Sequence, residues 1–367
     1  MSLPTNKIML RSPYHLDVNE QNLSYVIVGL RMWLGEVADE PTDVTVRLRT
    51  PALDGVCSLE ISDIVRDYID VKFYTNEESN AVLVSYEITK VYVDGTATVE
   101  PKEYLIGFDG YGTFTDGANY SAPDRVLMST DEFSSYTDTN NRIPVLAEEF
   151  TGYKLQVYTG PIGGYVTFRN ITGLTAPTST EDAVKYINTF YGSTYADRVI
   201  IEFATGQDET VDVQYQECNK YGVIVGYFVN RFGVIEQFHF TGRFNVSMES
   251  NETKFKRNIR DNDGYNVHRH QEHIINKNGK ASFELNTGWI PEKENDTIIE
   301  MIMSEQVWLQ VDSDKFGVGL IPQQSSIYTI PVQITSKNHN VKSKLNEKLI
   351  NYNFKFSAAN DWINSVR

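Results

Sequence analysis

The sequence contains very little cysteine, and this narrows the class of protein. Cys57 and Cys218 are the two cysteines among 367 residues, and they are far apart, without the close spacing of a metal site. A disulfide framework is therefore excluded. We expect assembly in a reducing compartment, with both thiols in the core.

Long apolar runs are also lacking. No stretch approaches the roughly 18 consecutive apolar residues of a membrane-spanning helix. The N-terminal stretch MSLPTNKIML is too short and too polar for a signal peptide. We therefore expect no membrane partner and assembly in the cytoplasm.

Sequence motifs of catalysis are missing as well. The chain has no Gly-x-Ser-x-Gly nucleophile elbow, no Walker loop and no dinucleotide-binding fingerprint. Its carboxylates are too numerous and too scattered to single out a glycosidase pair. We predict that the protein is not an enzyme and uses no cofactor.

Three of the six histidines gather in one short segment: His268, His270 and His273. On a strand, His268 and His270 would project from the same face, where a metal ion could bridge them. The HxHxxH spacing differs from the HExxH of zinc proteases. We favour a polar surface cluster and predict no metal site.

The chain is acidic, yet it contains one basic segment. With 33 basic and 49 acidic residues its formal charge is −16, which argues against a general nucleic-acid coat. Between Lys254 and Lys280, seven basic residues outnumber three acidic ones and give a local charge of +4. Such a segment meets an acidic neighbouring subunit or solvent more often than DNA. We take its first four basic residues as interface candidates: Lys254, Lys256, Arg257 and Arg260.

Aromatic and β-branched residues are abundant, and they form the strongest local pattern between Cys218 and Met248. Apolar residues alternate before the turn Asn230-Arg231-Phe232-Gly233 and continue after it, which predicts two paired strands. We expect this hairpin to be a rigid stem that carries the basic segment outward. Arg231 at the turn is a candidate for contact with a neighbour, with a local salt bridge or solvent exposure as the alternatives.

Trp362 lies five residues from the C-terminus. A large ring there is ordered only if it docks against something. Trp362 is therefore also an interface candidate.

The pattern along the chain predicts a mainly β protein, with two or more β-sandwich-like domains, one or two short helices and long loops. Residues 1–120 form an N-terminal β-sandwich domain with a helical turn or two at Ser62 to Tyr68. Residues 121–200 form a loop-rich middle segment with one helix, whose apolar stripe runs from Ala183 to Tyr191. Residues 201–367 form a C-terminal β-rich domain with the basic segment, a strand at Ile298 to Met303 and a terminal arm.

Several short landmarks are spread over most of the chain: Arg11-Ser12-Pro13-Tyr14, Leu59 to Asp67, Gly107 to Gly112, the hairpin from Cys218 to Gly242, and Leu349-Ile350-Asn351-Tyr352. In these the chain resembles virion structural proteins of tailed bacteriophages, in particular the tail ring or barrel proteins of crAss-like podoviruses. The landmarks are structural rather than catalytic, and they do not assign a particular ring.

The resemblance implies β-sandwich domains arranged as a closed homo-oligomeric ring, six- or twelvefold, in contact with neighbouring tail or portal-proximal ring proteins. It implies a place in the virion tail after assembly in the cytoplasm of the bacterial host. The expected function is to form a ring of the short tail that takes part in genome ejection and offers an attachment platform. DNA would only pass through the lumen, and an acidic chain would not hold it there.

The Tyr-rich β architecture also suits another class, a carbohydrate-binding or adhesin-like module of a phage fibre or cell surface. Selective binding on a glycan array would favour that class. A hydrolase acting on cell-wall polymer is the third class we consider.

Overall fold

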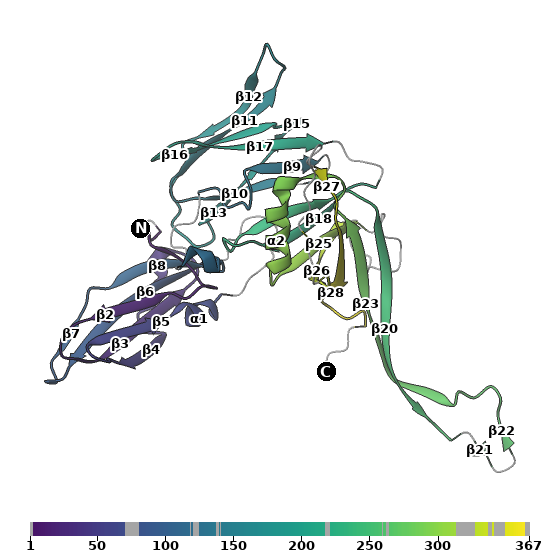
Figure 1. The fold of residues 1–367 in the computed structure, drawn as a ribbon, viewed down its shortest axis with the longest axis horizontal. Coiled ribbons are helices and arrows are strands. Elements are labelled where there is room, and N and C mark those ends of the chain that lie inside the picture. Colours follow the sequence, from purple (N-terminus) through teal and green to yellow (C-terminus); the bar gives the residue numbers. More distant parts are fainter. Residues whose placement is uncertain are drawn as a thin grey trace. The chain divides into compact units, whose positions relative to one another are not determined.

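The computed structural model describes residues 3–69, 81–117, 119, 125–136, 139, 141–216, 221–258, 260–261, 264–312, 327–336, 340 and 349–363 (Figure 1). The protein is mainly β, with 55% strand and 8% helix, and the described residues form several separate sheets and two short α-helices. This confirms the predicted fold class. Of the described helices, none is long and apolar enough to cross a membrane.

The chain divides into two compact units. Unit 1 comprises Met1–Glu217, Phe228–Gln237 and Asp296–Ser304, and unit 2 comprises Cys218–Tyr227, Phe238–Asn295 and Glu305–Arg367. The predicted boundaries at residues 120 and 200 both fall inside unit 1.

Unit 1 begins with a mixed sheet that has six strands within the described residues. Its order is β1 (Lys7–Met9), β8 (Glu103–Phe108), β6 (Ala81–Tyr92), β3 (Leu23–Trp33) and β4 (Val46–Pro51), and β7 (Ala97–Val99) also pairs with β6. Two further strands, β2 (His15–Asn19) and β5 (Val56–Glu60), pair with each other. The helix α1 (Ser62–Arg66) follows β5 and confirms the helical turn predicted there.

Side chains alternate between the two faces of this mixed sheet, and each face packs against its own buried cluster. Val28 of β3 and Val84 of β6 share one buried cluster with Leu16 of β2 and Val65 of α1. This cluster also contains Cys57, which is 2% exposed, as predicted. Cys218 lies outside the described residues.

The opposite face of the sheet has its own cluster. It contains Trp33 of β3, Leu83 of β6 and Phe108 of β8, together with Val184 and Phe232 from later parts of the chain. A 3-10 turn, η1 (Val37–Asp39), lies just after β3, and η2 (Phe114–Asp116) follows β8.

Three further sheets of unit 1 lie within the described residues. The largest has the order β12 (Tyr165–Thr172), β11 (Phe150–Tyr158), β16 (Arg198–Phe203), β17 (Glu209–Gln216) and β9 (Glu132–Tyr136). A smaller one joins β10 (Arg142–Leu146) to β13 (Val184–Asn188), and a short pair joins β14 (Phe190–Tyr191) to β15 (Thr194–Tyr195). Ile143 and Ile187 of the small sheet pack in one cluster with Leu155 and Val199 of the large one.

The helix predicted in the middle segment is wrong. The residues concerned form β13 and β14, and β13 pairs antiparallel with β10 from Arg142↔Asn188 to Leu146↔Val184. Val184 and Ile187 are both buried, and their spacing of three suits a helix as well as an irregularly buried strand. The backbone hydrogen bonds to β10 and the β-branched side chains decide for the strand.

The strand predicted at Ile298 to Met303 is wrong in the opposite sense. A 3-10 turn, η3 (Glu292–Glu294), leads into helix α2 (Asn295–Met303). Ile298 and Met301 are fully buried and three residues apart, so they lie on one face of the helix. A short run of Ile and Met residues without regular alternation of polar residues is also typical of a fully buried strand, which explains the wrong prediction.

Unit 2 is built on a sheet that has seven strands within the described residues. Its order is β19 (Ile235–Phe240), β18 (Ile224–Val229), β25 (Val307–Asp312), β26 (Ile327–Ile334), β28 (Asn353–Ala358), β23 (Glu272–Asn286) and β20 (Phe244–Lys256). Two short pairs accompany it, β21 (Arg260–Asp261) with β22 (Gly264–Tyr265) and β24 (Ile290–Pro291) with β27 (Leu349–Ile350). The ring of Phe240 lies 5.6 Å from that of Phe356 and 5.1 Å from that of Phe238, centroid to centroid.

The predicted hairpin is confirmed as β18 and β19, and its turn is part of unit 1. Phe232 is 1% exposed and shares a cluster with Met9 and Phe108. The backbone N–H of Tyr111 donates to the carbonyl oxygen of Arg231 at 2.7 Å. The turn therefore covers one face of the mixed sheet with Phe232, and a backbone hydrogen bond holds it there.

Gly110 allows this close approach. A Cβ atom at Gly110 would lie 2.4 Å from the carbonyl oxygen of Arg231 and 2.5 Å from Sδ of Met9. We expect Gly110→Ala to lower the free energy of unfolding by about 1–3 kcal/mol, the range of an overpacked core. Urea unfolding of the full chain measures this change.

Gly29→Ala is the matched control. A Cβ atom at Gly29 meets Val44 at 3.4 Å, an ordinary contact, so we expect a change of under about 1 kcal/mol. Equal losses in the two variants would contradict the role given to the contact between Gly110 and the turn.

Candidate assembly interface

A long β-ribbon projects from the sheet of unit 2. β20 and β23 have 13 and 15 residues and pair antiparallel from Phe244↔Leu285 to Lys256↔Glu272. β28 accompanies β23 only along Ser282–Asn286, so the two strands continue beyond the sheet as a pair, with β21 and β22 at the far end (Figure 1). We call residues 248–280, without 259, 262 and 263, the arm.

The arm has its own stem. From the sequence we expected the hairpin β18–β19 to carry the basic segment outward. This prediction is wrong, because the basic segment belongs to a separate hairpin that β20 forms with β23. Proximal residues of β23 alternate between buried and partly buried as far as Gly279. Beyond that point the alternation ends, and every residue of β20 from Met248 to Lys256 is exposed.

Exposed ion pairs and one ring contact join side chains within the described part of the arm. Lys254 Nζ lies 2.5 Å and Lys277 Nζ 3.6 Å from carboxylate oxygens of Glu252. The rings of Phe255 and His273 face each other at 5.6 Å between centroids. A two-stranded ribbon is marginally stable in water, and exposed ion pairs add little. The arm therefore lacks a core of its own.

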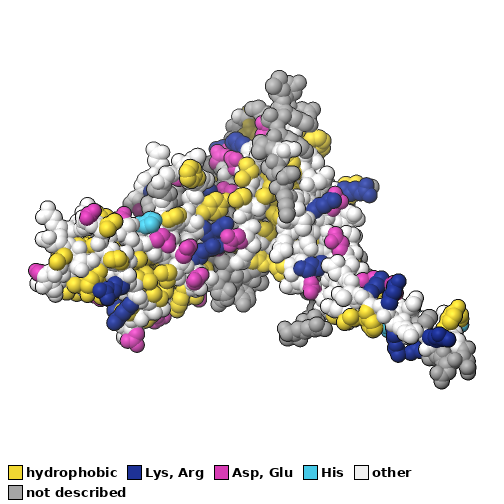
Figure 2. Space-filling view, turned by 60° about the horizontal axis from the view of Figure 1, so that its bottom comes forward, with side chains coloured by type: hydrophobic (Ala, Val, Ile, Leu, Met, Phe, Trp, Pro, Cys, Tyr) yellow, Lys and Arg dark blue, Asp and Glu magenta, His cyan; other side chains and the backbone are white. Residues whose placement is uncertain are grey.

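The arm nevertheless exposes large apolar side chains. Their exposed fractions range from 39% to 76%, and they are Met248, Phe255, Tyr265, Val267, Ile274 and Ile275. Figure 2 shows hydrophobic and basic side chains together along this ribbon. Exposed apolar groups rimmed by charge are typical of a protein interface.

The structure brings the four predicted basic residues together on the arm. Lys254 and Lys256 lie on β20, Arg257 follows its last residue, and Arg260 lies on β21. All four are exposed. These four side chains are therefore open to a partner along the arm.

His268 and His270 do not lie on one strand, the arrangement considered for a bridging metal ion. His268 lies in a turn and His270 in the loop just after it, and the backbone N–H of His268 donates to Asn266 Oδ1 at 2.9 Å. His273 lies on β23. Among the residues that the structure describes, no group of three or more His, Cys, Asp or Glu is placed to hold a metal ion.

Trp362 lies in a segment that docks on β23 of the same unit. Its backbone N–H donates to the carbonyl oxygen of Gly279 at 2.7 Å, and Ile363 N–H donates to Asn278 Oδ1 at 2.8 Å. The side chain of Trp362 remains 40% exposed. The backbone of this segment is thus held where the arm begins, and the indole ring is partly free to contact a neighbour.

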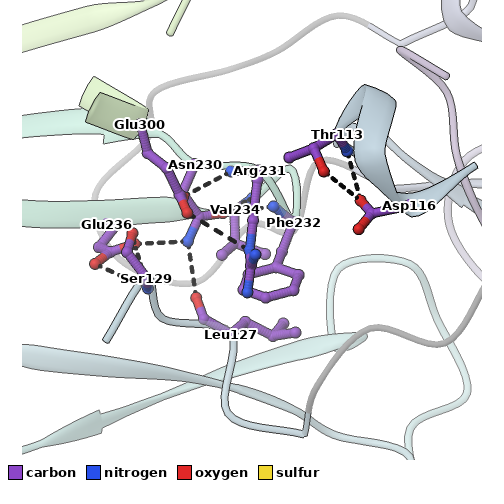
Figure 3. Close-up of polar contacts among 10 residues, drawn as sticks. All are labelled: Thr113, Asp116, Leu127, Ser129, Asn230, Arg231, Phe232, Val234, Glu236 and Glu300. Atoms are coloured by element: carbon purple, nitrogen blue, oxygen red, sulfur yellow. Dashed lines mark hydrogen bonds and ion pairs between the residues drawn. The ribbon is translucent and has the colours of Figure 1, made fainter. Parts of the chain in front are cut away.

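Arg231 makes a local contact within unit 1 (Figure 3). Its Nε lies 3.5 Å from Glu300 Oε1, and its backbone N–H donates to Glu300 Oε2 at 3.0 Å. The guanidinium also lies 4.6 Å from the ring centroid of Phe232, and the side chain is 37% exposed. The local salt bridge is the alternative that the geometry favours.

A buried carboxyl pair beside Arg231 was not predicted from the sequence. Glu236 of β19 and Glu300 of α2 are 2% and 8% exposed. Glu236 Oε2 accepts hydrogen bonds from Asn230 Nδ2 at 2.7 Å and from Ser129 Oγ at 2.8 Å (Figure 3). Glu236 lies in a strand of mixed polarity beside Gln237 and close to His239, and nothing in the sequence pairs it with Glu300.

Burial disfavours the charged form of both acids. Burial, with the nearby charge of Glu300, raises the pKa of Glu236 from 4.5 to about 8. Burial also raises the pKa of Glu300, while the hydrogen bond and charge of Arg231 oppose that rise. At neutral pH the pair therefore retains a proton, most readily on Glu236.

This proton makes stability depend on pH. The folded state keeps it up to about pH 8, whereas the unfolded chain releases it near pH 4.5, so the free energy of unfolding falls as pH rises between these values. We expect Glu236→Gln to reduce this fall. Urea unfolding at a series of pH values measures the slope.

Glu249→Gln, on the exposed arm, is the matched control and should leave the slope as in the wild type. A Glu236→Gln protein with an unchanged slope would show that Glu236 ionises normally in the folded state.

No protein-family model matches the chain, and no curated protein matches it. The basis for a functional conclusion is therefore the geometry of the arm, together with the sequence landmarks.

Proposed function

We propose that this protein is a virion structural subunit that forms an oligomeric ring of a short phage tail. The ring would be part of the genome-delivery conduit and a platform for neighbouring tail proteins. The observation that carries this proposal is the arm, an exposed β-ribbon with apolar and basic side chains and no core of its own.

Burial against another subunit would stabilise the arm. Each square ångström of apolar surface removed from water contributes about 25 cal/mol, and the six apolar side chains of the arm offer such surface. A projecting element that docks on a different surface of the next subunit makes a heterologous contact. Such contacts form closed rings when the rotation between subunits closes.

The negative charge of the chain supports a role as a conduit that surrounds DNA rather than as a protein that binds DNA. A net charge of −16 repels a polyanion, and a conduit must let the genome pass without binding it. The resemblance to tail ring proteins in the sequence landmarks points the same way. No catalytic step is assigned to the chain.

Removal of the arm tests the proposal. Ser250 and Gly279 are register partners, so residues 251–278 can be replaced by Asn-Gly, a two-residue hairpin loop. We expect the wild type to form closed rings in electron micrographs and the shortened chain to remain folded but monomeric. Light scattering after gel filtration gives the mass of each, and circular dichroism checks the fold.

Point variants make the same test without a deletion. Ile274→Ser with Ile275→Ser removes two apolar side chains of the arm, and we expect fewer rings. The control is Ile162→Ser, which changes a fully exposed isoleucine outside the arm and should leave the rings intact. A wild-type chain that stays monomeric at every concentration would overturn the proposal, and selective binding on a glycan array would favour a carbohydrate-binding module.

A further inference from the structure

Charge is divided unevenly between the two units. Unit 1 has 16 basic and 36 acidic residues, a formal charge of −20, and unit 2 has 17 basic and 13 acidic residues, a formal charge of +4. Within unit 2, the segment from Lys254 to Lys280 holds seven basic and three acidic residues, which leaves ten of each elsewhere. The whole positive excess of unit 2 therefore lies in this segment, which makes up most of the arm, and the rest of the arm adds Glu249 and Glu252.

We propose that the arm docks on the acidic surface of unit 1 of a second copy of this chain. This inference rests on the proposed function in that both require self-association, and it adds the partner and the chemistry of the contact. Two unlike surfaces meet in it, so each copy can give its arm to one neighbour and receive the arm of another.

The arm has the reach for this contact. From Met248 to Lys256, β20 is an extended strand, and nine residues at about 3.3 Å each span about 30 Å. That length extends past the sheet that anchors it, because β28 pairs with β23 only as far as Ser282. A neighbouring subunit lies within such a distance in a packed ring.

Unit 1 presents its negative charge at the surface. Even carboxylates that form ion pairs remain open to solvent, as with Asp182 and Asp212, whose side chains are both 51% exposed. Complementary potentials of this kind steer association and fix its register. Salt weakens them, since the screening length falls from about 10 Å at 0.1 M to about 3 Å at 1 M.

The apolar side chains of the arm favour protein over nucleic acid as its occupant. Phosphate contacts use Lys and Arg, and they leave exposed groups such as Val267 and Ile275 without apolar surface to cover them. A duplex or an anionic membrane would also meet the repulsion of a chain with net charge −16. A second copy offers both the acidic residues of unit 1 and exposed apolar side chains, such as Leu53 and Val93.

Charge reversal on the full-length chain tests the inference. The variant Lys256→Glu with Arg257→Glu and Arg260→Glu should weaken self-association at least about tenfold, because each basic side chain becomes repulsive toward unit 1. The wild-type association should weaken as salt rises. Sedimentation velocity at several concentrations and salt levels measures both.

The matched control reverses three exposed basic residues outside the arm: Arg47, Arg243 and Lys355. The same change in net charge should leave self-association close to wild type. Circular dichroism and thermal melting show whether each variant is folded.

Cross-linking identifies the contact directly. A carbodiimide joins lysine amines to carboxylates without a spacer, and a mixture of ¹⁴N- and ¹⁵N-labelled chains separates links between copies from links within one copy. We expect mixed-label peptides that join arm lysines such as Lys254 and Lys277 to carboxylates of unit 1.

Four outcomes would overturn the inference. If the charge-reversed variant forms rings as well as the wild type, the proposed docking of the arm is wrong, although the proposed ring remains. Links from the arm to unit 1 within a single copy alone would show an intramolecular contact. An arm that binds duplex DNA or anionic vesicles, with self-association untouched by charge reversal, would identify a different occupant, whereas a wild type that never associates would remove the proposed function as well.

Discussion

The turn from Asn230 to Gly233 makes a backbone contact that much of unit 1 depends on. A Cβ atom at Gly233 would lie 2.7 Å from backbone atoms of Asp109, and Gly233 has φ +77°, which suits glycine. This approach places Phe232 in the cluster that covers one face of the mixed sheet. The strands on either side of the turn lead into the large sheet of unit 2, where Phe240 packs against Phe356. One hairpin thus supplies core residues to both units.

A network of polar groups holds the turn in shape. Asn230 is fully buried, accepts hydrogen bonds from the backbone of Phe232 and Val234, and donates to Leu127 and Glu236. Each buried polar group in such a network needs its partner, because an unpaired one is costly in a low dielectric. Glu236 meets this demand by accepting hydrogen bonds from Asn230 and Ser129 and by keeping its proton, whereas Glu300 does so through Arg231.

The arm is organised in the opposite way. Where β23 is flanked by β28, its inward side chains Phe283 and Leu285 are fully buried. Where that flanking strand ends, the same ribbon continues with apolar side chains in water and with seven basic residues between Lys254 and Lys280. The buried polar groups at the turn are hydrogen-bonded, whereas the apolar side chains of the arm are exposed to water. We expect a partner to cover such an exposed apolar surface.

The sequence by itself determined the β class, the hairpin at Asn230 to Gly233, the helical turn at Ser62 and the basic surface from Lys254 onward. These follow from local alternation, turn chemistry and composition, which act over a few residues. Tertiary structure decided the rest. Residues 184–188 became a strand because β10 offered hydrogen bonds, and 295–303 became a helix because Ile298 and Met301 find a buried environment on one helical face. The pairing of Glu236 with Glu300 and the exposure of the arm depend on which segments meet in space, and contacts between residues far apart in the chain leave no periodic signal in it.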